Sequence, residues 1–302
     1  MFAADFRDRI VHHILVNELN KIYEKRFIFD SYACRKGKGT HKAVKRLKKF
    51  TQSYQNNNKT YKRGFFLQLD IRNFFMSIDK RILFDLIEKR LFVSKEFSKC
   101  QKEELLYLLR IIVFSQPEKD FVKKSSGLMW EKVPKHKSLF NTEKDKGLPI
   151  GNYSSQFFAN IYLHELDFFV KNFLRVKPYV RYVDDFILVS KNKDCLLKCF
   201  FEILFFVKNN LLLDLKKESI LLPLSNGIDF LGYIIRPYSV FVRKRVLINF
   251  KKKISSYNEL VKSKELDDFD KKQFKATKAS YLGHFKHADC FRIKKEFLDN
   301  IA

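Results

Sequence analysis

Three aspartates occupy positions where apolar segments of the chain end. Asp70 closes the apolar run 65–69, and Asp184 and Asp185 interrupt the largely apolar run 180–190. The first run predicts a buried strand that delivers a carboxylate at its C-terminal end. The second run predicts two strands that meet at a tight acidic turn.

Three carboxylates at strand ends match the ligand set of a two-metal site. Adjacent carboxylates repel each other strongly unless a cation neutralises them. A two-metal site holds two Mg²⁺ ions about 3.5–4 Å apart and clamps the attacking and leaving oxygens of an in-line phosphoryl transfer. The sequence therefore predicts that Asp70, Asp184 and Asp185 bind two Mg²⁺ ions and catalyse phosphoryl transfer. Taken alone, the Asp184-Asp185 pair also fits a solvated turn, so the apolar strands around it carry the prediction.

The charge of the chain predicts a strongly anionic partner. The 302 residues include 60 Lys+Arg against 34 Asp+Glu, a formal charge of +26. Nucleic acid is the commonest partner of so basic a protein, and a membrane surface is the alternative. Hydrophobic residues make up 46% of the chain, enough for a substantial core, and only 9 Gly and 6 Pro argue against a disordered or linker-rich protein.

Cysteine usage and apolar patterning predict a cytoplasmic protein. The five cysteines are scattered and odd in number, which suits a reducing compartment better than a disulfide framework. The first eight residues contain no apolar core of the signal-peptide type. The most apolar stretch, 195–215, is broken by Lys198, Glu202 and Lys208, so we expect a buried helix there and no contact with a membrane.

Hydrophobic periodicity predicts an α+β fold with strands gathered around the aspartates. We expect helices over residues 7–29, 41–52, 80–92, 102–114, 154–173 and 195–210. Further strands are expected near 211–215 and in a hairpin through 228–235 and 240–242. The polar, lysine-rich segment 117–146 predicts an extended loop or a β-hairpin. Residues 244–302 are predicted to be helical and basic, with a boundary near residue 243.

A basic stretch broken by glycines, and the helix after it, predict a phosphate-contacting surface. Eight Lys and Arg residues fall within 35–49, and Thr40 fits the N-cap of the helix. The basic residues of this helix share one face: Lys42, Lys45, Arg46 and Lys49. A solvated charged face is the alternative for such a run. The charge of the whole chain favours contact with nucleic acid, to which Lys38 in the preceding loop would add.

Four motifs, in the order in which they occur, resemble those of reverse transcriptases. Residues 69–75 resemble the first metal-binding motif of the palm, and 182–185 resemble the second. Residues 147–160 look like the template- and nucleotide-contacting motif, and 230–233 look like the primer grip. The resemblance covers nearly the whole chain and implies an RNA-directed DNA polymerase with a right-hand fold.

The resemblance also implies a division of the chain. Residues 1–243 would form the fingers and the palm, and 244–302 a small helical thumb. Reverse transcriptases of this kind carry a basic strand upstream of the segment that matches Phe2–Asp5, and its Lys and Arg help to hold the incoming triphosphate. We therefore expect either fingers that are shortened at the N-terminus or replacement of this strand by Lys38 and neighbouring basic residues.

Three further segments are similar to reverse transcriptases of diversity-generating retroelements: 6–13, 31–41 and 281–288. In that family the enzyme copies a template-repeat RNA with frequent errors opposite adenine, and the mutated cDNA replaces a variable repeat in a target gene (mutagenic retrohoming). The resemblance implies an RNA that primes and templates, deoxynucleoside triphosphates, a small basic accessory variability protein, and a bacterial, archaeal or phage origin. Reverse transcriptases of retron, group II intron or abortive-infection type remain alternatives, as does a non-catalytic RNA-binding scaffold.

The resemblance gives the acidic residues and one lysine specific roles. Asp70 and Asp184 would bridge both metal ions, with Asp185 contributing less directly and the backbone carbonyl of Ile71 joining the metal shell. The primer 3′-hydroxyl would attack the α-phosphate of the nucleotide. Lys217 fits the lysine proposed to protonate the leaving pyrophosphate.

Other roles implied by the resemblance concern the nucleotide and the template. Phe75 would exclude a 2′-hydroxyl and so select deoxynucleotides, although a core role is the alternative in a chain with 33 Phe. High-fidelity relatives place Gln and Pro where this chain has Ile150 and Gln156, and loss of a hydrogen-bonding amide there should weaken discrimination; neutral packing variation is the alternative. Arg72 and Gly151 complete the nucleotide-binding set. The template- and primer-binding set is Lys38, Lys42, Lys45, Arg46, Phe230, Leu231 and Gly232.

Overall fold

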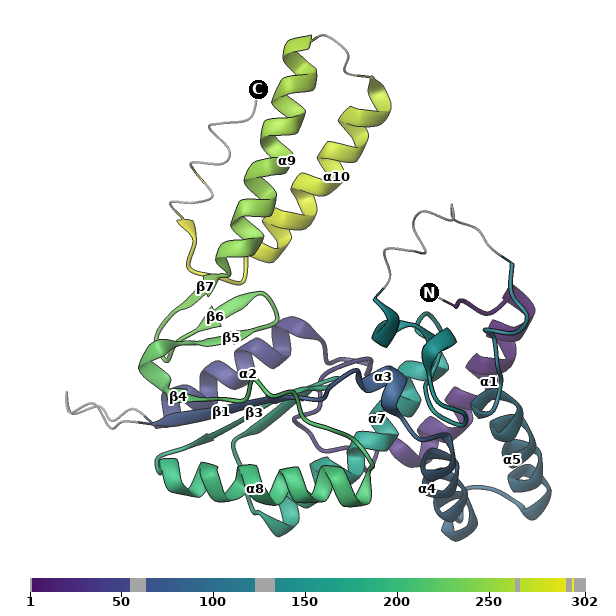
Figure 1. Cartoon of the computed structure of the whole chain (residues 1–302). Coiled ribbons are helices and arrows are strands. Elements are labelled where there is room, and N and C mark those ends of the chain that lie inside the picture. The colour runs from purple at the N-terminus through teal and green to yellow at the C-terminus, as the bar shows by residue number, and fades with distance from the viewer. Residues whose placement is uncertain (1, 55–63, 123–133, 264–266, 292–294, 296–302) are drawn as a thin grey trace. The chain divides into compact units, whose positions relative to one another are not determined.

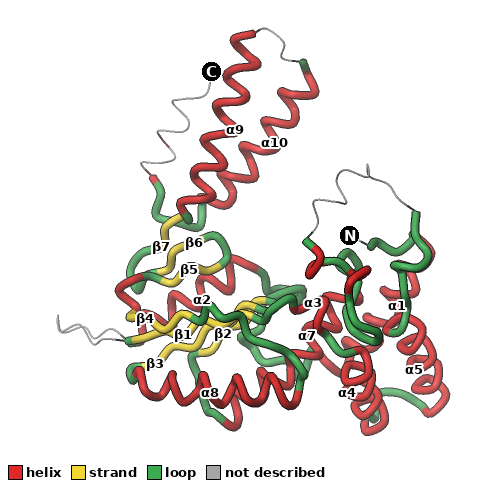
Figure 2. Tube along the Cα trace, in the orientation of Figure 1, coloured by secondary structure: helices red, strands yellow, loops and turns green. Residues whose placement is uncertain are grey.

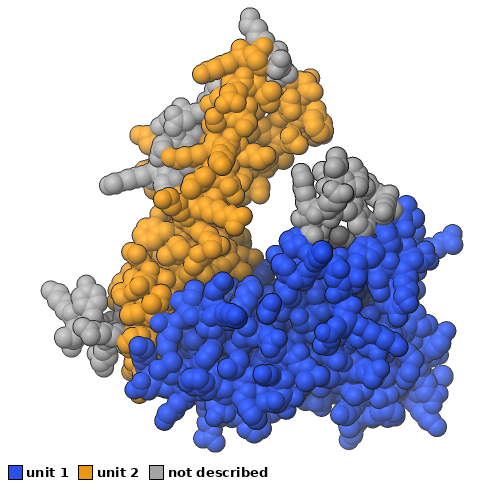
Figure 3. Space-filling model, in the orientation of Figure 1, with its two compact units in different colours: residues 1–39, 67–188, 193–221 blue, residues 40–66, 189–192, 222–302 orange. Residues whose placement is uncertain are grey.

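The computed structural model describes residues 2–54, 64–122, 134–263, 267–291 and 295. The chain forms two compact units that each combine several segments (Figure 3). Unit 1 comprises Met1–Gly39, Leu67–Leu188 and Lys193–Leu221, and unit 2 comprises Thr40–Phe66, Val189–Asn192 and Leu222–Ala302.

The helices of unit 1 surround one almost fully buried helix, α7 (Tyr153–Phe168), which continues as a π-helix over Phe169–Phe173. It packs against α1 (Phe6–Tyr23), α4 (Lys80–Val93) and α8 (Lys193–Asn210), and α4 packs in turn against α5 (Lys99–Val113). Buried apolar residues face each other in these contacts, as along α7: Phe157, Phe158, Ile161, Leu163 and Leu166. This packing makes α7 the scaffold on which the neighbouring loops and strands are held.

Side-chain caps fix where several of these helices begin. The Asp79 carboxylate accepts hydrogen bonds from the backbone N–H groups of Arg81 and Ile82 at the start of α4. Ser98 and Gln101 form a reciprocal capping box at the start of α5. Such caps satisfy N–H groups that have no partner within the helix. The short helix α3 (Phe74–Ser77) follows Asn73, which adopts a left-handed conformation.

A four-stranded sheet carries the acidic residues. Its strand order is β2-β3-β1-β4, with β1 at Phe65–Asp70, β2 at Tyr179–Tyr182, β3 at Asp185–Ser190 and β4 at Ile220–Pro223 (Figures 1 and 2). Strands β2 and β3 are antiparallel, and Tyr182 pairs with Asp185 across their turn. The sheet therefore brings the end of β1 and the β2–β3 turn to neighbouring strands.

Unit 2 contains helix α2 (Thr40–Ser53), a three-stranded antiparallel sheet and two long helices. The strands are β5 (Ile228–Phe230), β6 (Tyr233–Ile235) and β7 (Val240–Val242), and α2 packs against β6. Helices α9 (Lys244–Ser263) and α10 (Asp268–Phe285) share a small core, in which the rings of Tyr257 and Phe274 stack at 3.9 Å.

Most of the predicted elements are present, with three corrections. The strand predicted near 211–215 is wrong, because only Leu215 forms a β-bridge, to Ile71. The predicted helix 7–29 ends at Tyr23, where the chain turns so that Phe27 packs against His164 and Phe157. The segment 228–235 is two strands rather than one, because Leu231 and Gly232 adopt left-handed conformations between them.

The remaining predictions concern 117–146 and residue 243. Residues 123–133 lie outside the described residues, and the described part of 117–146 contains two short 3₁₀ turns and one β-bridge, from Lys146 to Asp79. Residue 243 lies within unit 2, at the junction of β7 and α9. None of the helices within the described ranges is both long and apolar enough to cross a membrane.

Candidate active site

Strand β1 and the β2–β3 turn bring Asp70 and Asp184 together. Asp70 is the last residue of β1, and Asp184 lies in the turn between Tyr182 and Asp185. Val183 forms this turn with a φ of 56°. A left-handed conformation is a rare and strained state for a β-branched residue, so the surrounding structure must hold it in place.

A fully buried ion pair holds the turn. The Arg181 guanidinium donates to both carboxylate oxygens of Asp167 on α7, at 2.7 and 2.6 Å, and neither side chain is exposed to solvent. Its Nη1 also donates to the Val183 carbonyl at 2.9 Å and to Asn160 Oδ1 at 3.2 Å. Tyr179 donates its hydroxyl to Asp167 at 2.7 Å. Because α7 is buried and packed on several sides, this network fixes the strained turn and therefore the position of Asp184.

The electrostatics of the Asp70–Asp184 pair favour a cation. Burial, together with the charge of Asp70, raises the pKa of Asp184 to about 6. Asp70 Oδ1 is buried without a hydrogen-bond partner among the described residues, while Oδ2 accepts from Lys216 Nζ at 2.6 Å. The bond to Asp70 raises the pKa of Lys216. The Asp185 carboxylate accepts from Gln68 Nε2 at 3.1 Å, and its charge, like those of Asp70 and Asp184, raises the pKa of Lys216.

The pair suits a hard divalent cation. Mg²⁺ is usually bound through one or two carboxylates, with water or substrate phosphates completing its shell. Asp70 and Asp184 supply two such carboxylates, one with a buried oxygen that no hydrogen bond satisfies. In the part of the chain that the structure describes, no three His, Cys, Asp or Glu side chains are gathered as a metal-binding group.

Backbone pairing explains why Lys216 contacts Asp70. The segment 214–216 runs beside 70–72, where Lys216 N–H donates to the Asp70 carbonyl and Arg72 N–H donates to the Asp214 carbonyl, both at 2.8 Å. Ile71 is fully buried within this pairing. The lysine proposed from the sequence, Lys217, is the exposed neighbour of Lys216. Sequence reasoning missed Lys216 because the pairing of 214–216 with 70–72 decides which of the two adjacent lysines reaches Asp70, and this pairing cannot be read from the sequence.

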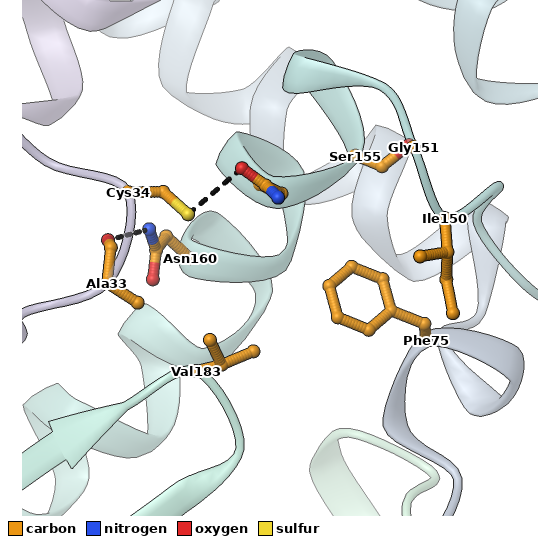
Figure 4. Close-up of a pocket in the computed structure, with 9 residues that line it drawn as sticks. Ala33, Cys34, Phe75, Ile150, Gly151, Ser155, Asn160 and Val183 are labelled. Carbon is orange, nitrogen blue, oxygen red and sulfur yellow. Dashed lines mark hydrogen bonds between the residues drawn. The ribbon is translucent and has the colours of Figure 1, made fainter. Parts of the chain in front are cut away.

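An apolar pocket opens beside the β2–β3 turn (Figure 4). Phe75, Ile150 and Gly151 contribute to its wall, and Figure 4 shows the Phe75 ring facing Ile150. The other lining residues are Ala33, Cys34, Ser155, Gln156, Asn160 and Val183. Four of the five predicted nucleotide-binding residues therefore line one cavity, and Val183 links that cavity to the turn that carries Asp184.

The segment 31–39 closes the pocket on the side of Cys34. The Cys34 thiol donates to Gln156 Oε1 at 3.0 Å, and Asn160 Nδ2 donates to the Ala33 carbonyl at 2.9 Å (Figure 4). Arg35 anchors the same segment through an ion pair with Glu24 at 2.7 Å. Lys38 bends back on this segment, where its ammonium group donates to the Phe29 carbonyl at 2.8 Å and lies over the Phe29 ring.

The remaining predicted residues belong to unit 2. Lys42 and Lys45 are exposed on α2, and Arg46 lies over the Phe50 ring at 4.4 Å. The predicted primer-grip residues form the β5–β6 turn, in which the fully buried Phe230 is followed by Leu231 and Gly232. A side chain at Gly232 would meet His284 at 3.1 Å, so the turn is held close to α10.

Sequence reasoning also missed the buried network of Arg181, Asp167 and Asn160. A charged residue within an apolar strand next to an acidic turn was a signal, because a buried charge needs a partner. The two histidines of α1 contact α7: His12 Nδ1 hydrogen-bonds the Ser154 hydroxyl at 2.8 Å, and His13 stacks on Tyr153.

Strand-end carboxylates beside an apolar pocket, in a fold of helices and antiparallel sheets, define a protein of the polymerase type. The family described as reverse transcriptase (RNA-dependent DNA polymerase) matches residues 3–235. The chain therefore belongs to the reverse transcriptase family, as its four motifs predicted. A search of the curated proteins found no match.

Solved structures of telomerases share the fold. Apo telomerase from Candida tropicalis aligns with a TM-score of 0.54 and 14% identity over 80% of this chain and 44% of that one. Telomerase from Candida albicans, in complex with the TWJ fragment of telomeric RNA, aligns with a TM-score of 0.52 and 14% identity. This alignment covers 82% of this chain and 42% of that one. Telomerase from Candida tropicalis in complex with the same fragment aligns with a TM-score of 0.53 and 16% identity, over 95% of this chain and 49% of that one. This chain thus spans less than half the length of each, and at these identities the likeness concerns the fold alone.

Proposed function

We propose that this protein synthesises DNA on an RNA template, with Asp70 and Asp184 as the metal-binding catalytic carboxylates. The observation that carries the proposal is the pairing of these carboxylates at adjoining strand ends, with the buried Asp70 Oδ1 unsatisfied and the pKa of Asp184 raised to about 6. Such a pair is costly to bury and is found where charge must be concentrated for a function.

Each residue of the site has a role in this reaction. Two Mg²⁺ ions, when bound, would activate the primer 3′-hydroxyl and neutralise the charge that develops on the departing pyrophosphate. Asp70 and Asp184 would hold these ions, with Asp185, whose carboxylate accepts a hydrogen bond from Gln68, contributing less directly. Phe75, Ile150, Gly151 and Gln156 form the wall against which the nucleotide would rest, with the Phe75 ring excluding a 2′-hydroxyl.

Basic residues supply the contacts with nucleic acid in this proposal. Arg72 would contact the triphosphate. Lys38, Lys42, Lys45 and Arg46, together with the turn Phe230–Gly232, would contact template and primer. The palm and fingers would lie within residues 1–243 and the thumb within 244–302, the thumb being built on α9 and α10.

Primer extension tests the enzymatic proposal. Purified protein is supplied with an RNA template, a DNA or RNA primer, deoxynucleoside triphosphates and Mg²⁺. Asp184→Asn should lower extension at least a hundredfold, because it removes one charge from the site. Asp268→Asn is the matched control, since Asp268 is an exposed residue of α10 whose carboxylate pairs with Lys271 along the helix. Equal activity of wild type and Asp184→Asn would refute the assignment of the carboxylates.

We further propose that the product is made with errors directed to template adenines, as in diversity-generating retroelements. The support is the resemblance of 6–13, 31–41 and 281–288, and the place of Ile150 and Gln156 in the pocket wall. Ile150 brings an apolar side chain to a wall where an amide would add hydrogen bonds that distinguish right from wrong pairs.

Sequencing of the cDNA tests the second proposal. Substitutions should be several times more frequent opposite adenine than opposite the other template bases, and Ile150→Gln should reduce that excess. The assay is run with and without a small basic accessory variability protein, which the resemblance implies as a partner. Uniform error rates over the four template bases in both conditions would favour a reverse transcriptase of another bacterial type.

A further inference from the structure

One hydrogen bond in the pocket wall has no role in the reaction as proposed. The Cys34 thiol donates to Gln156 Oε1 at 3.0 Å, and both side chains line the pocket (Figure 4). We propose that Cys34 orients the Gln156 amide toward the nascent base pair and is thereby a positioning residue for base selection. This inference rests on the proposed polymerase function and concerns the selectivity of the same site.

The chemistry of the amide makes its orientation important. A Gln amide carries an acceptor oxygen and a donor NH₂ group on the same carbon, and a thiol is a weak donor. When Cys34 occupies the oxygen, the donor NH₂ is the half of the amide left for a ligand. Every base pair presents acceptors on its minor-groove edge. A donor fixed beside that edge therefore tests the geometry of the pair and not the identity of the base.

Gln156 is the amide of the pocket wall that retains this capacity. The other amide, Asn160, is nearly fully buried and is engaged at both ends, because Nδ2 donates to the Ala33 carbonyl and Oδ1 accepts from Arg181. Gln156 lies at the exposed surface of the pocket, one turn before Asn160 on α7. The amide that holds the scaffold and the amide that can face a ligand are thus different residues.

The backbone around Cys34 is held firmly enough to orient a side chain. Cys34 has a φ of 52°, a left-handed conformation that is unusual for a residue with a Cβ. Asn160 holds the Ala33 carbonyl on one side, and on the other the Arg35 guanidinium binds Glu24 and the carbonyls of Ile28 and Ser31. Burial raises the pKa of the Cys34 thiol, which keeps it protonated and able to donate at neutral pH.

The same contacts link the pocket to the catalytic turn. Asn160 accepts from Arg181, and Arg181 also holds the Val183 carbonyl at the strained turn before Asp184. Asn160 thus fixes the segment of Cys34 relative to the residues that fix Asp184. A displaced base pair would meet a donor whose position is defined by the same buried scaffold as the reacting carboxylates.

Single-nucleotide insertion kinetics test the proposal. The ratio of kcat/KM for the correct over an incorrect deoxynucleotide is measured for wild type, Cys34→Ala, Cys34→Ser, Gln156→Met and the double variant Cys34→Ala/Gln156→Met. Cys34→Ala should lower the ratio about three- to tenfold, the worth of one neutral hydrogen bond. Cys34→Ser keeps a donor and should restore most of it. Because Cys34 acts through Gln156, the double variant should be no less selective than Gln156→Met alone.

Two controls separate orientation from general damage. The preference for deoxy- over ribonucleotides should not change in Cys34→Ala, because Phe75 and not Gln156 faces the sugar. Cys100→Ala, at an exposed thiol of α5, should leave base selectivity at the wild-type value. Thermal melting of each variant shows that it is folded.

The outcomes distinguish this inference from the proposed function. An active wild type whose Cys34→Ala variant is equally selective, or whose Cys34→Ser variant behaves like Cys34→Ala, overturns the inference and leaves the polymerase assignment standing. Additive effects of Cys34→Ala and Gln156→Met overturn it as well. A wild-type protein that extends no primer overturns the proposed function, and this inference falls with it.

Discussion

Asp184 illustrates how a largely buried carboxylate can lower the stability of the fold that holds it. Burial and the charge of Asp70 raise its pKa from 3.8 to about 6. An acid whose pKa is higher in the folded than in the unfolded state binds its proton more tightly when folded. Folding is therefore penalised increasingly as pH rises from about 4 to 6, and the full penalty persists above pH 6.

Because ionisation of Asp184 destabilises the folded state, removing its charge should stabilise the protein. Asp184→Asn should raise the free energy of unfolding by about 1–2 kcal/mol at pH 7.5 without Mg²⁺, a value reduced from the full shift because the residue is partly exposed. At pH 5 the gain should be about half as large. Urea unfolding at the two pH values measures this, with Asp268→Asn as the control. A gain that is absent at pH 7.5, or larger at pH 5, would contradict the proposed cost.

Lys216 and Lys217 allow a second test at the scale of single residues. Lys216 is the lysine whose ammonium group reaches Asp70, so we expect it to be the one that supports the chemistry. Lys216→Gln should lower kcat about a hundredfold, the lower end of the usual contribution of a positioned proton donor, with less effect on KM. Lys217→Gln removes the same charge one position away and should cost less than threefold. A larger loss in Lys217→Gln would restore the role that the sequence motif implied.

At the scale of elements, the β2–β3 hairpin depends on α7. Arg181 is fully buried in β2, and its partners Asp167 and Asn160 lie on α7. Removing one partner of a buried ion pair leaves an uncompensated charge and costs about 3–5 kcal/mol, whereas removing both costs less than the sum. The hairpin is therefore stabilised only if both charges are present.

A double-mutant cycle tests this coupling. Arg181→Met and Asp167→Asn should each lower the free energy of unfolding by about 3–5 kcal/mol, and the double variant should be less destabilised than the two together. Denaturant unfolding monitored by circular dichroism provides the values. Additivity of the two effects, or a loss below about 1 kcal/mol in either single variant, would show that the pair does not hold the hairpin.

Local patterns predicted elements well where one face of the element is buried. The helices that became α2, α4 and α8 and the strands β1, β2 and β3 were found within a few residues, because their apolar periodicity follows their burial. The segment near 211–215 failed because its apolar residues Leu211 and Leu213 are buried without strand pairing. Periodicity reports burial of a face and not the hydrogen bonds of the backbone.

The candidate site shows the same limit. Asp70 and Asp184, which the structure brings together, could be proposed as a pair because a carboxylate after an apolar strand is visible in the sequence. Arg181 could not be assigned a role, because its partners Asp167 and Asn160 lie 14 and 21 residues away on α7. Tertiary packing decides which side of this helix is turned toward β2. The bond between Cys34 and Gln156 joins residues 122 positions apart and is likewise a product of the fold.

At the scale of the whole molecule, the dominant quantity is the formal charge of +26. Binding of nucleic acid by such a chain releases counterions, so the logarithm of the binding constant should fall linearly with the logarithm of salt concentration. The slope counts the phosphates that are neutralised, and it therefore distinguishes a defined binding surface from general attraction.

Helix α2 offers such a surface, since its basic residues lie opposite the buried Ala43, Val44 and Leu47. We expect the triple variant Lys42→Gln/Lys45→Gln/Arg46→Gln to reduce the magnitude of the slope for single-stranded RNA by about 2. Each lost phosphate contact accounts for about 0.7 of this change. The matched control, Lys89→Gln/Lys95→Gln/Lys99→Gln, removes the same charge from exposed positions of α4, α5 and the loop between them. Fluorescence anisotropy with labelled RNA, measured over salt concentrations from about 50 to about 300 mM, yields both slopes. If the control changes the slope as much as the α2 variant does, the RNA responds to net charge alone, and α2 is not the binding surface.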